Sequence, residues 1–480
     1  MRLSVCTSAS ALVIAIAAGS AIIAGRPDVS NLPPILQPHR PIAIAAINGV
    51  GGLLIRMKLF GLPSETEAVA GGCKAAALPP NAECHLDMPG EVPEWREGLR
   101  AVLKSYGRDA QLTALGILIA RGQIENWLVT RARLVHAWRT LPAGALESER
   151  IRSPIFIVGL PRTGTTFLLN LLKQDPQLRT PLHWELVEPI PGHGEPSGAS
   201  HVDKIQGRLE QYVQLLPGIE ELHPMSATMA EECVVTMAHE FSSQLFEATT
   251  NVSSYVTWLL AKPSHAHVMR WHKRLLRHLQ RDERLHGRGT GDKHGARASE
   301  ARQWVLKTPW YLPLLDELPA PYPDALVIHT HRAPAAVVAS SASLHAKTFG
   351  AGSDHINLEA IGAQQLRMTE DVLSRGLEVR RRWKAAGAES TPRVADVQLE
   401  ALKADALGTV AQIYAQLGLE LTAEARASME AWLREKEVRH GGHKAQLETF
   451  GLSAKAIMKG SHVFRQYCED YGVAHCDRDV

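Results

Sequence analysis

A chain of 480 residues is long enough to bury a large single core or to form two domains. Its 52 basic and 50 acidic residues leave a formal net charge of +2 at pH 7. This near balance excludes the one-sided basic surface of a nucleic-acid-binding protein, so any site for an anion must be local.

The first long stretch without charge lies near the N-terminus. Residues Leu3 to Gly25 carry no charged side chain and lie between Arg2 and Arg26. Their number suits a helix that crosses a bilayer, but they are rich in Ala, Ser and Gly rather than Leu and Phe, so insertion is only weakly favourable. Residues 1–40 are therefore a candidate leader or membrane anchor, with a signal peptide or a buried helix as alternatives. An anchor predicts membrane association, for example in a Golgi-type lumen, and its absence a cytoplasmic location.

Helical patterns follow over residues 41–150, which we expect to form a helical N-terminal region. Pro41 to Ile55 is a second uncharged run, interrupted by Asn48 and three glycines, and predicts a core helix. Glu94 to Trp138 carries apolar residues at three- and four-residue steps, which predicts two helices that face the core. These apolar positions are Leu99, Leu103, Leu112, Leu115, Leu118, Ile119, Trp127, Leu128 and Leu134.

The pattern changes at Ser153. Pro154 to Val158 is a short apolar run typical of a strand buried on both faces, and Gly164 to Lys173 reads as a helix with one apolar face. Further strand-like runs are Trp304–Leu306, Ala325–Ile328 and Arg393–Val397. Because strands alternate with helices, residues 151–480 are predicted to form an α/β domain, a three-layer parallel sheet flanked by helices. Arg277 to Arg302 is charged, lacks either period and predicts an exposed insertion.

The strongest chemical signal is the loop between the first strand and its helix. Gly159 to Thr166 reads GLPRTGTT, and its glycines allow the backbone to wrap around an anion. The first N–H groups of the helix and its dipole favour negative charge at the same place. Strand, loop and helix together predict a P-loop-like fold. The candidate anion ligands are Arg162, Thr163, Gly164, Thr165 and Thr166.

The same loop differs from that of nucleotide triphosphatases. Those proteins place Lys after the second glycine, where this chain has Thr165. In addition, no acidic residue closes Ala325–Ile328 to hold Mg²⁺. A P-loop kinase or nucleotide triphosphatase is therefore the weaker interpretation of this loop.

Six cysteines show none of the short spacings of paired zinc ligands, so we expect no metal. Cys73 and Cys84 lie near each other in sequence, as do Cys468 and Cys476. Two local disulfides are conceivable in an oxidising compartment, and reduced, buried thiols are the alternative.

Two further segments place cationic side chains at strand ends. Lys307 follows Trp304–Leu306, while Arg332 follows Ala325–Ile328 and precedes a helix that carries Ser340. Open α/β proteins bind ligands at the carboxyl edge of the sheet. We therefore expect Lys307 to stabilise charge on a leaving phosphate, and Arg332 with Ser340 to hold a second phosphate. The alternatives are a solvated lysine and a structural ion pair of the arginine.

Taken in this order, the segments resemble the sulfotransferases that use 3′-phosphoadenosine 5′-phosphosulfate (PAPS), particularly the bacterial and algal type. The matching pieces are Pro154–Thr166, Trp184–Glu185, Leu306–Pro309, His331–Ser340 and Phe450–Leu452. The resemblance implies transfer of a sulfuryl group from PAPS to a hydroxyl or amine of an unidentified acceptor, without a metal. It also implies that Arg162 to Thr166 hold the 5′-phosphosulfate, that Arg332 and Ser340 hold the 3′-phosphate, and that Lys307 assists transfer.

The chain departs from the family pattern at two places. Ala333 stands where Asp is common, and Ala445 stands where an aromatic residue is common. Gly441 to Lys444 resembles the stretch that covers the nucleotide, so Lys444 is a further candidate ligand of the donor. The small Ala445 predicts weaker contacts to the adenine or the acceptor.

Transfer needs a general base near the phosphosulfate to take the acceptor proton. Glu185 is the first candidate, because it follows the strand predicted at Leu178–Leu182 and resembles the glutamate of related enzymes. His183 is the second candidate, and Glu231 or Glu232 the third. A salt bridge or helix cap is the alternative role for Glu185. A membrane-tethered protein that binds the nucleotide without turnover is the remaining alternative for the chain.

Overall fold

The computed structural model describes residues 33, 36, 42–58, 60–286, 302–387, 391–436 and 445–478. The uncharged stretch Leu3–Gly25 and the candidate ligand Lys444 lie outside these residues, so both remain predictions from sequence. Within the described ranges, every helix is too short or too polar to span a bilayer.

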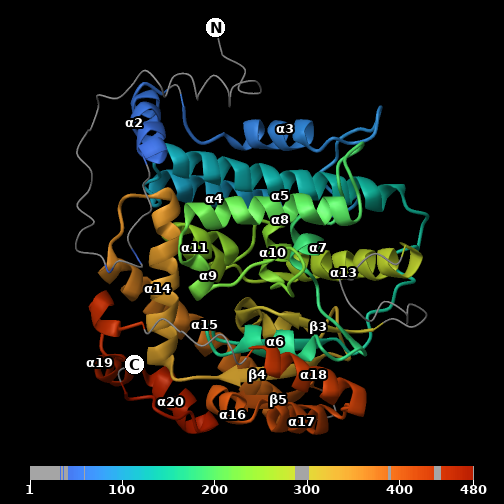
Figure 1. Cartoon of the computed structure of the whole chain (residues 1–480), viewed down its shortest axis with the longest axis vertical. Coiled ribbons are helices and arrows are strands. Elements are labelled where there is room, and N and C mark those ends of the chain that lie inside the picture. Colours follow the sequence, from blue (N-terminus) through green and yellow to red (C-terminus); the bar gives the residue numbers. More distant parts are fainter. Residues whose placement is uncertain are drawn as a thin grey trace.

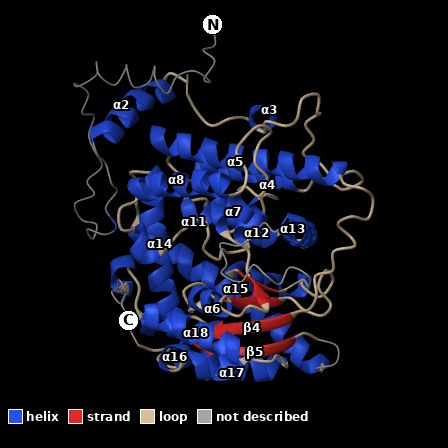
Figure 2. Ribbon diagram, turned by 45° about the vertical axis from the view of Figure 1, so that its right-hand side comes forward, coloured by secondary structure: helices blue, strands red, loops and turns tan. Residues whose placement is uncertain are grey.

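A five-stranded parallel sheet occupies the lower half of the molecule (Figures 1 and 2). Its strands are β1 (Ile155–Gly159), β2 (Leu178–Arg179), β3 (Gln303–Lys307), β4 (Leu326–His331) and β5 (Arg393–Gln398), in the order β2-β3-β1-β4-β5. Each predicted strand is present, and the predicted α/β class is confirmed. The largest differences in bounds are that β2 ends at Arg179 instead of Leu182 and that β4 continues to His331, so that Arg332 directly follows the strand.

The side chains of the central strand β1 show why the fold has three layers, with the sheet between two layers of helices. Ile155 and Ile157 point to one face of the sheet and pack against α6 (Thr165–Leu172), α16 (Leu399–Ala404), α17 (Ala406–Leu417) and α18 (Ala423–Lys436). Phe156 and Val158 point to the other face and join a larger apolar core. A strand that is apolar at every position therefore has helices on both sides.

The second face of the sheet is covered by long helices and a 3₁₀ segment. These are α13 (Ala266–His286), η3 (Pro309–Glu317), α14 (Pro334–Gly352) and α15 (Leu358–Ala386), with η4 (Leu447–Phe450), α19 (Ala454–Gly460) and α20 (His462–Tyr471) near the C-terminus. Figure 1 shows α14 running along one side of the molecule from the sheet toward the upper helices. This helix therefore connects the sheet to the helical half.

The helical half lies above the sheet in both views (Figures 1 and 2). Before β1 it contains α2 (Ile42–Arg56), α3 (Glu65–Ala75), α4 (Trp95–Arg108) and α5 (Ala114–Thr140). Between β2 and β3 it contains α7 (His183–Val187), α8 (Ala199–Leu215), α9 (Ile219–Leu222), α10 (Val234–Ala238), α11 (Leu245–Thr249) and α12 (Ser253–Ala261). The two helices predicted within Glu94–Trp138 are thus α4 and α5.

Helix α2 confirms the helix predicted at Pro41–Ile55 but not its place in the core. Leu53 is 46% exposed, and the helix lies on the surface of α5. The residues that interrupt its apolar run are the ones that contact α5. Asn48 accepts the N–H of Leu115 at 3.0 Å, and Gly51 lies so close to Ala114 that a Cβ there would clash.

The predicted insertion at Arg277–Arg302 begins later than expected, because α13 continues to His286. Glu149 holds this end of the helix: its main-chain oxygen accepts from Arg277 at 3.1 Å, and its carboxylate accepts from Arg284 at 2.6 Å. Gln280 is buried and donates to the same carboxylate at 3.1 Å. Residues 287–301 lie outside the described ranges.

Both conceivable disulfides are formed. Cys73 at the end of α3 is bonded to Cys84, and Cys468 in α20 is bonded to Cys476. Cys233 is a buried free thiol, and burial raises its pKa to about 12. It is therefore unreactive at neutral pH.

Candidate active site

The loop after β1 is shaped by residues with positive φ. Gly159 has φ +140°, and a Cβ there would lie 2.5 Å from Thr330 Oγ1, so only glycine lets β1 pass β4 at this point. Arg162 and Gly164 also have positive φ, at +66° and +86°. These turns bring the chain back so that α6 begins at Thr165 with its free N–H groups toward the loop.

Thr163 is a candidate anion ligand from sequence, but it is not among the residues that line the cavity beside the loop. Its side chain is fully buried, its hydroxyl donates to the Leu160 carbonyl at 2.7 Å, and it lies 2.6 Å from the Thr330 hydroxyl. Thr163 therefore fixes the shape of the loop. Gly164, Thr165 and Thr166 line this cavity as the sequence predicts.

Arg162 and Arg332 line the same cavity. A guanidinium N–H of Arg332 donates to the carbonyl oxygen of Arg162 at 2.8 Å. Arg162 in turn donates from Nε to the Ser340 hydroxyl at 3.0 Å and from Nη1 to the Leu222 carbonyl at 2.9 Å. Burial lowers the pKa of both arginines, and the charge of Arg162 lowers the pKa of Arg332 further. An anion between them would relieve this repulsion.

Lys307 approaches the loop from the end of β3. It is 1% exposed, and its ammonium donates to Thr166 Oγ1 at 2.9 Å while forming an ion pair with Glu232. Thr166 and Glu232 line the cavity, whereas Lys307 lies behind them. The lysine is thus held close to the loop that the sequence predicts to bind the anion.

His183 and Glu231 form a hydrogen-bonded pair in the cavity wall, with His183 Nδ1 2.7 Å from a Glu231 oxygen. An antiparallel bridge between Leu182 and Ala230 sets this contact by placing the two residues side by side. Burial disfavours the charge of Glu231, but the hydrogen bond and charge of His183 outweigh it and lower the pKa of Glu231 to about 2. The carboxylate orients the imidazole through Nδ1, and only the neutral form of His183, with Nε2 unprotonated, can accept a proton.

The structure places Glu185, the first candidate base from sequence, away from the cavity wall. Glu185 is 1% exposed and is not among the residues that line the cavity. Its carboxylate accepts from Arg179 of β2 at 2.8 Å and from the N–H of Leu182 at 2.9 Å. Burial raises the pKa of Glu185, while the charge of Arg179 opposes the rise. The salt bridge and the helix cap, which were the alternatives from sequence, are both present.

The cavity has a volume of about 720 Å³ and two chemically distinct ends. What we call the sheet end carries the loop and the polar groups described above. It is formed by Pro161, Arg162, Gly164, Thr165, Thr166, His183, His223, Glu231, Glu232, Thr308, Pro309, Arg332 and Leu399. The rest, which we call the helical end, is formed by residues of α5, α8, α9, α10, α11 and α14 together with Val187 and Met225.

Sequence reasoning did not identify the helical end. There, His345 of α14 lies 2.9 Å from Glu247 of α11, and both side chains are buried. Burial disfavours the charge on His345, but Glu247 outweighs it and raises the pKa of His345. Ser341, one turn earlier in α14, lines the cavity with a hydroxyl that has no hydrogen-bond partner among the described residues. Because the pair is 98 residues apart in sequence, no local motif could have predicted it.

One cluster away from the cavity has residue types that could bind a cation. Donor atoms of His329, His331 and Asp396 lie within 4.8 Å of one another. However, Arg380 donates to both Asp396 oxygens at 3.0 Å and lies 3.1 Å from His329 Nδ1. The guanidinium therefore already supplies the positive charge that this cluster needs.

Comparisons with known proteins agree with this geometry. Residues 154–423 match the model of the sulfotransferase family. The crystal structure of sulfotransferase STF1 from Mycobacterium tuberculosis H37Rv is 29% identical, with a TM-score of 0.66 over 83% of this chain and 98% of that chain. Sulfotransferase STF9 from Mycobacterium avium is 21% identical, with a TM-score of 0.68 over 85% of this chain and 96% of that chain, and supports the fold alone. No curated protein matches the chain.

Proposed function

Because the chain belongs to the sulfotransferase family, we propose that it transfers a sulfuryl group from PAPS to an acceptor hydroxyl or amine. The observation that carries the proposal is that Arg162 and Arg332 line the same cavity. The Arg332 guanidinium also donates a hydrogen bond to the main-chain carbonyl of Arg162. Two partly buried cations, each just before the start of a helix, suit a ligand with anionic groups at both ends.

Each part of the sheet end has a role in this proposal. Arg162 and the N–H groups at the start of α6 hold the phosphosulfate, with the Thr165 and Thr166 hydroxyls as further donors. Arg332 holds the 3′-phosphate. Ser340 accepts from Arg162 and still has its own O–H to donate, so it is proposed to add a contact to the bound anion beside Arg162. Lys444, beyond the described residues, is proposed to add a contact to the nucleotide.

His183 is the general base in this proposal. As the acceptor oxygen bonds to sulfur, the bond from sulfur to the bridging phosphate oxygen breaks, and His183 Nε2 takes the acceptor proton. Glu231 holds the ring and stabilises the imidazolium that forms. Lys307 and Arg162 stabilise the negative charge on the departing phosphate, since both lie at the loop.

Two measurements test the proposal. Purified protein is incubated with sulfur-35-labelled PAPS and a panel of alcohols, sugars and amines, and calorimetry compares adenosine 3′,5′-bisphosphate with ATP–Mg²⁺. We expect labelled product and preferential binding of the bisphosphate. Tighter binding of ATP–Mg²⁺ would favour the kinase alternative. Binding of the bisphosphate without product from any acceptor would favour the alternative of a non-catalytic nucleotide-binding protein.

A further inference from the structure

We propose that the acceptor is a lipophilic alcohol whose aliphatic body occupies the helical end of the cavity while its hydroxyl lies at His183. This inference rests on the proposed sulfuryl transfer and adds the chemical class of the acceptor. It follows from how polar and apolar groups are divided between the two ends of the cavity.

The surface of the cavity is mainly apolar, and its helical end brings together aliphatic side chains from separate helices and polar side chains that include Gln123, Asn126, Thr249, Ser341 and Thr348. The aliphatic side chains include Leu209 of α8, Ile219 of α9, Val235 of α10, Leu245 of α11 and Leu344 of α14, with Met225 between α9 and α10. Leu209, Leu245 and Leu344 are only partly buried, and all three line the cavity. A ligand that covers them gains the free energy of burying apolar surface.

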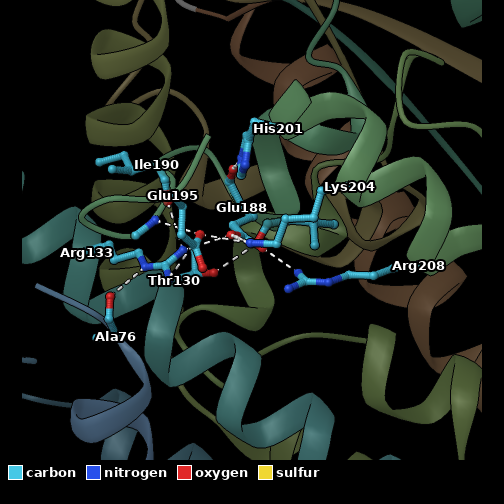
Figure 3. A network of polar contacts seen from close by, with 11 residues as sticks. Ala76, Thr130, Arg133, Glu188, Ile190, Glu195, His201, Lys204 and Arg208 are labelled. Atoms are coloured by element: carbon cyan, nitrogen blue, oxygen red, sulfur yellow. Dashed lines mark hydrogen bonds and ion pairs between the residues drawn. The ribbon is translucent and has the colours of Figure 1, made fainter. Parts of the chain in front are cut away.

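The charged groups at the helical end are already neutralised within the protein. Arg208 lines the cavity, but its guanidinium donates to Glu188 at 2.5 Å, and Figure 3 shows it directed into the network around that carboxylate. His345 is paired with Glu247 in the same way. An ionic acceptor would have to compete with the half-exposed Arg208 pair or break the buried His345–Glu247 pair, and a sugar would place many of its hydroxyls against aliphatic carbon. Both are poorer ligands here than an alkyl chain.

Aromatic stacking contributes little to this wall. Trp127 and Tyr212 are the only Trp, Tyr or Phe side chains among the described residues that line the cavity. Burial raises the pKa of Tyr212 to about 12, in agreement with an apolar surrounding. A wall of branched aliphatic side chains accommodates a flexible chain better than a flat ring that requires stacking partners.

A homologous series of primary alcohols tests the inference. Labelled PAPS is held at saturation while kcat/KM is measured for 1-butanol through 1-dodecanol, with glucose and phenol for comparison. We expect kcat/KM to rise about fourfold for each added methylene until the helical end is filled, and then to level off. Equal or greater values for glucose, or no dependence on chain length, would overturn the inference.

A size variant with a matched control locates the effect. Ala248→Phe places a ring in the helical end, whereas Ala199→Phe makes the same change at the exposed start of α8. We expect kcat/KM of Ala248→Phe to level off at a shorter alcohol than in the wild type. The chain-length dependence of Ala199→Phe should match that of the wild type. Equal chain-length dependence in all three proteins would contradict the proposed binding site. Thermal melting and calorimetry with adenosine 3′,5′-bisphosphate check that each variant is folded.

The outcomes separate this inference from the proposed function. If PAPS is turned over but polar acceptors are preferred, the acceptor class is wrong and the proposed function stands. If the bisphosphate does not bind and no acceptor is labelled, the proposed function fails, and the acceptor class fails with it.

Discussion

The two ends of the cavity are built in different ways. The sheet end has directional contacts: Lys307, Thr166 and Glu232 are joined by a hydrogen bond and an ion pair, and Arg332 is bonded to the Arg162 carbonyl. The helical end has mainly non-directional aliphatic contacts, contributed by helices far apart in sequence. Hydrogen-bonding groups reject a ligand that leaves them unpaired, whereas an apolar wall discriminates only weakly between apolar ligands of similar size. We therefore expect strict donor recognition and a graded preference among acceptors.

The largest effects are expected where directional contacts are lost at the sheet end. Lys307→Ala should lower kcat about 10²–10³-fold, because a preorganised cation near the leaving phosphate is removed. Arg332→Ala should weaken binding of adenosine 3′,5′-bisphosphate about 100-fold, since a charge-assisted contact is lost. Turnover and calorimetry measure these effects, with exposed Lys104→Ala as the control. Wild-type values in both variants would show that the sheet end does not bind the donor.

A second, smaller loss is expected when the base is changed. His183→Gln should lower kcat about 100-fold with little change in bisphosphate affinity, because proton transfer and not donor binding is affected. Glu185→Gln should lower stability through the Arg179 pair, but it should spare kcat in the protein that remains folded. The reverse result, with kcat lost only in the Glu185 variant, would restore Glu185 as the base.

The helical end should respond to pH through His345. The pKa of His345 is higher in the folded protein than the 6.5 of an unfolded chain. The charged form of His345 therefore stabilises the fold fully below pH 6.5. This stabilisation is lost as the pH rises through the pKa of the folded state. The stability advantage of wild type over His345→Gln should therefore be largest at about pH 6 and smaller at about pH 9, as measured by urea unfolding. An advantage that grows with pH would contradict the pairing with Glu247.

The smallest effect concerns the network that anchors α8. Figure 3 shows Lys204 beside Glu188 and Glu195, at 3.1 and 2.8 Å. Because Lys204 is partly exposed, Lys204→Met should lower the free energy of unfolding by only about 0.5–1 kcal/mol. The matched change Lys403→Met, in an exposed pair with Glu400, should cost less. Urea unfolding compares the two, and equal losses would mean that the network adds nothing to an ordinary surface pair.

The two ends also differ in what the sequence could predict. Gly159 to Thr166 is contiguous, so its composition predicted both the turn and the anion site. The sequence could not predict that Glu185 contacts Arg179, because proximity to this segment in sequence does not say where a side chain points. The helical end has no motif, because pairs such as His345 and Glu247 meet only in the folded chain.

The place of β1 at the centre of the sheet has a consequence for synthesis of the chain. Ile155 pairs with Val305 and Leu326, so neither neighbouring strand exists until about 150 further residues have been translated. At common elongation rates of about 5–20 residues per second, this takes roughly 8–30 s. During that interval an apolar strand is without both partners, which makes the nascent polypeptide a client for chaperones. Co-expression of chaperones should therefore increase the soluble yield.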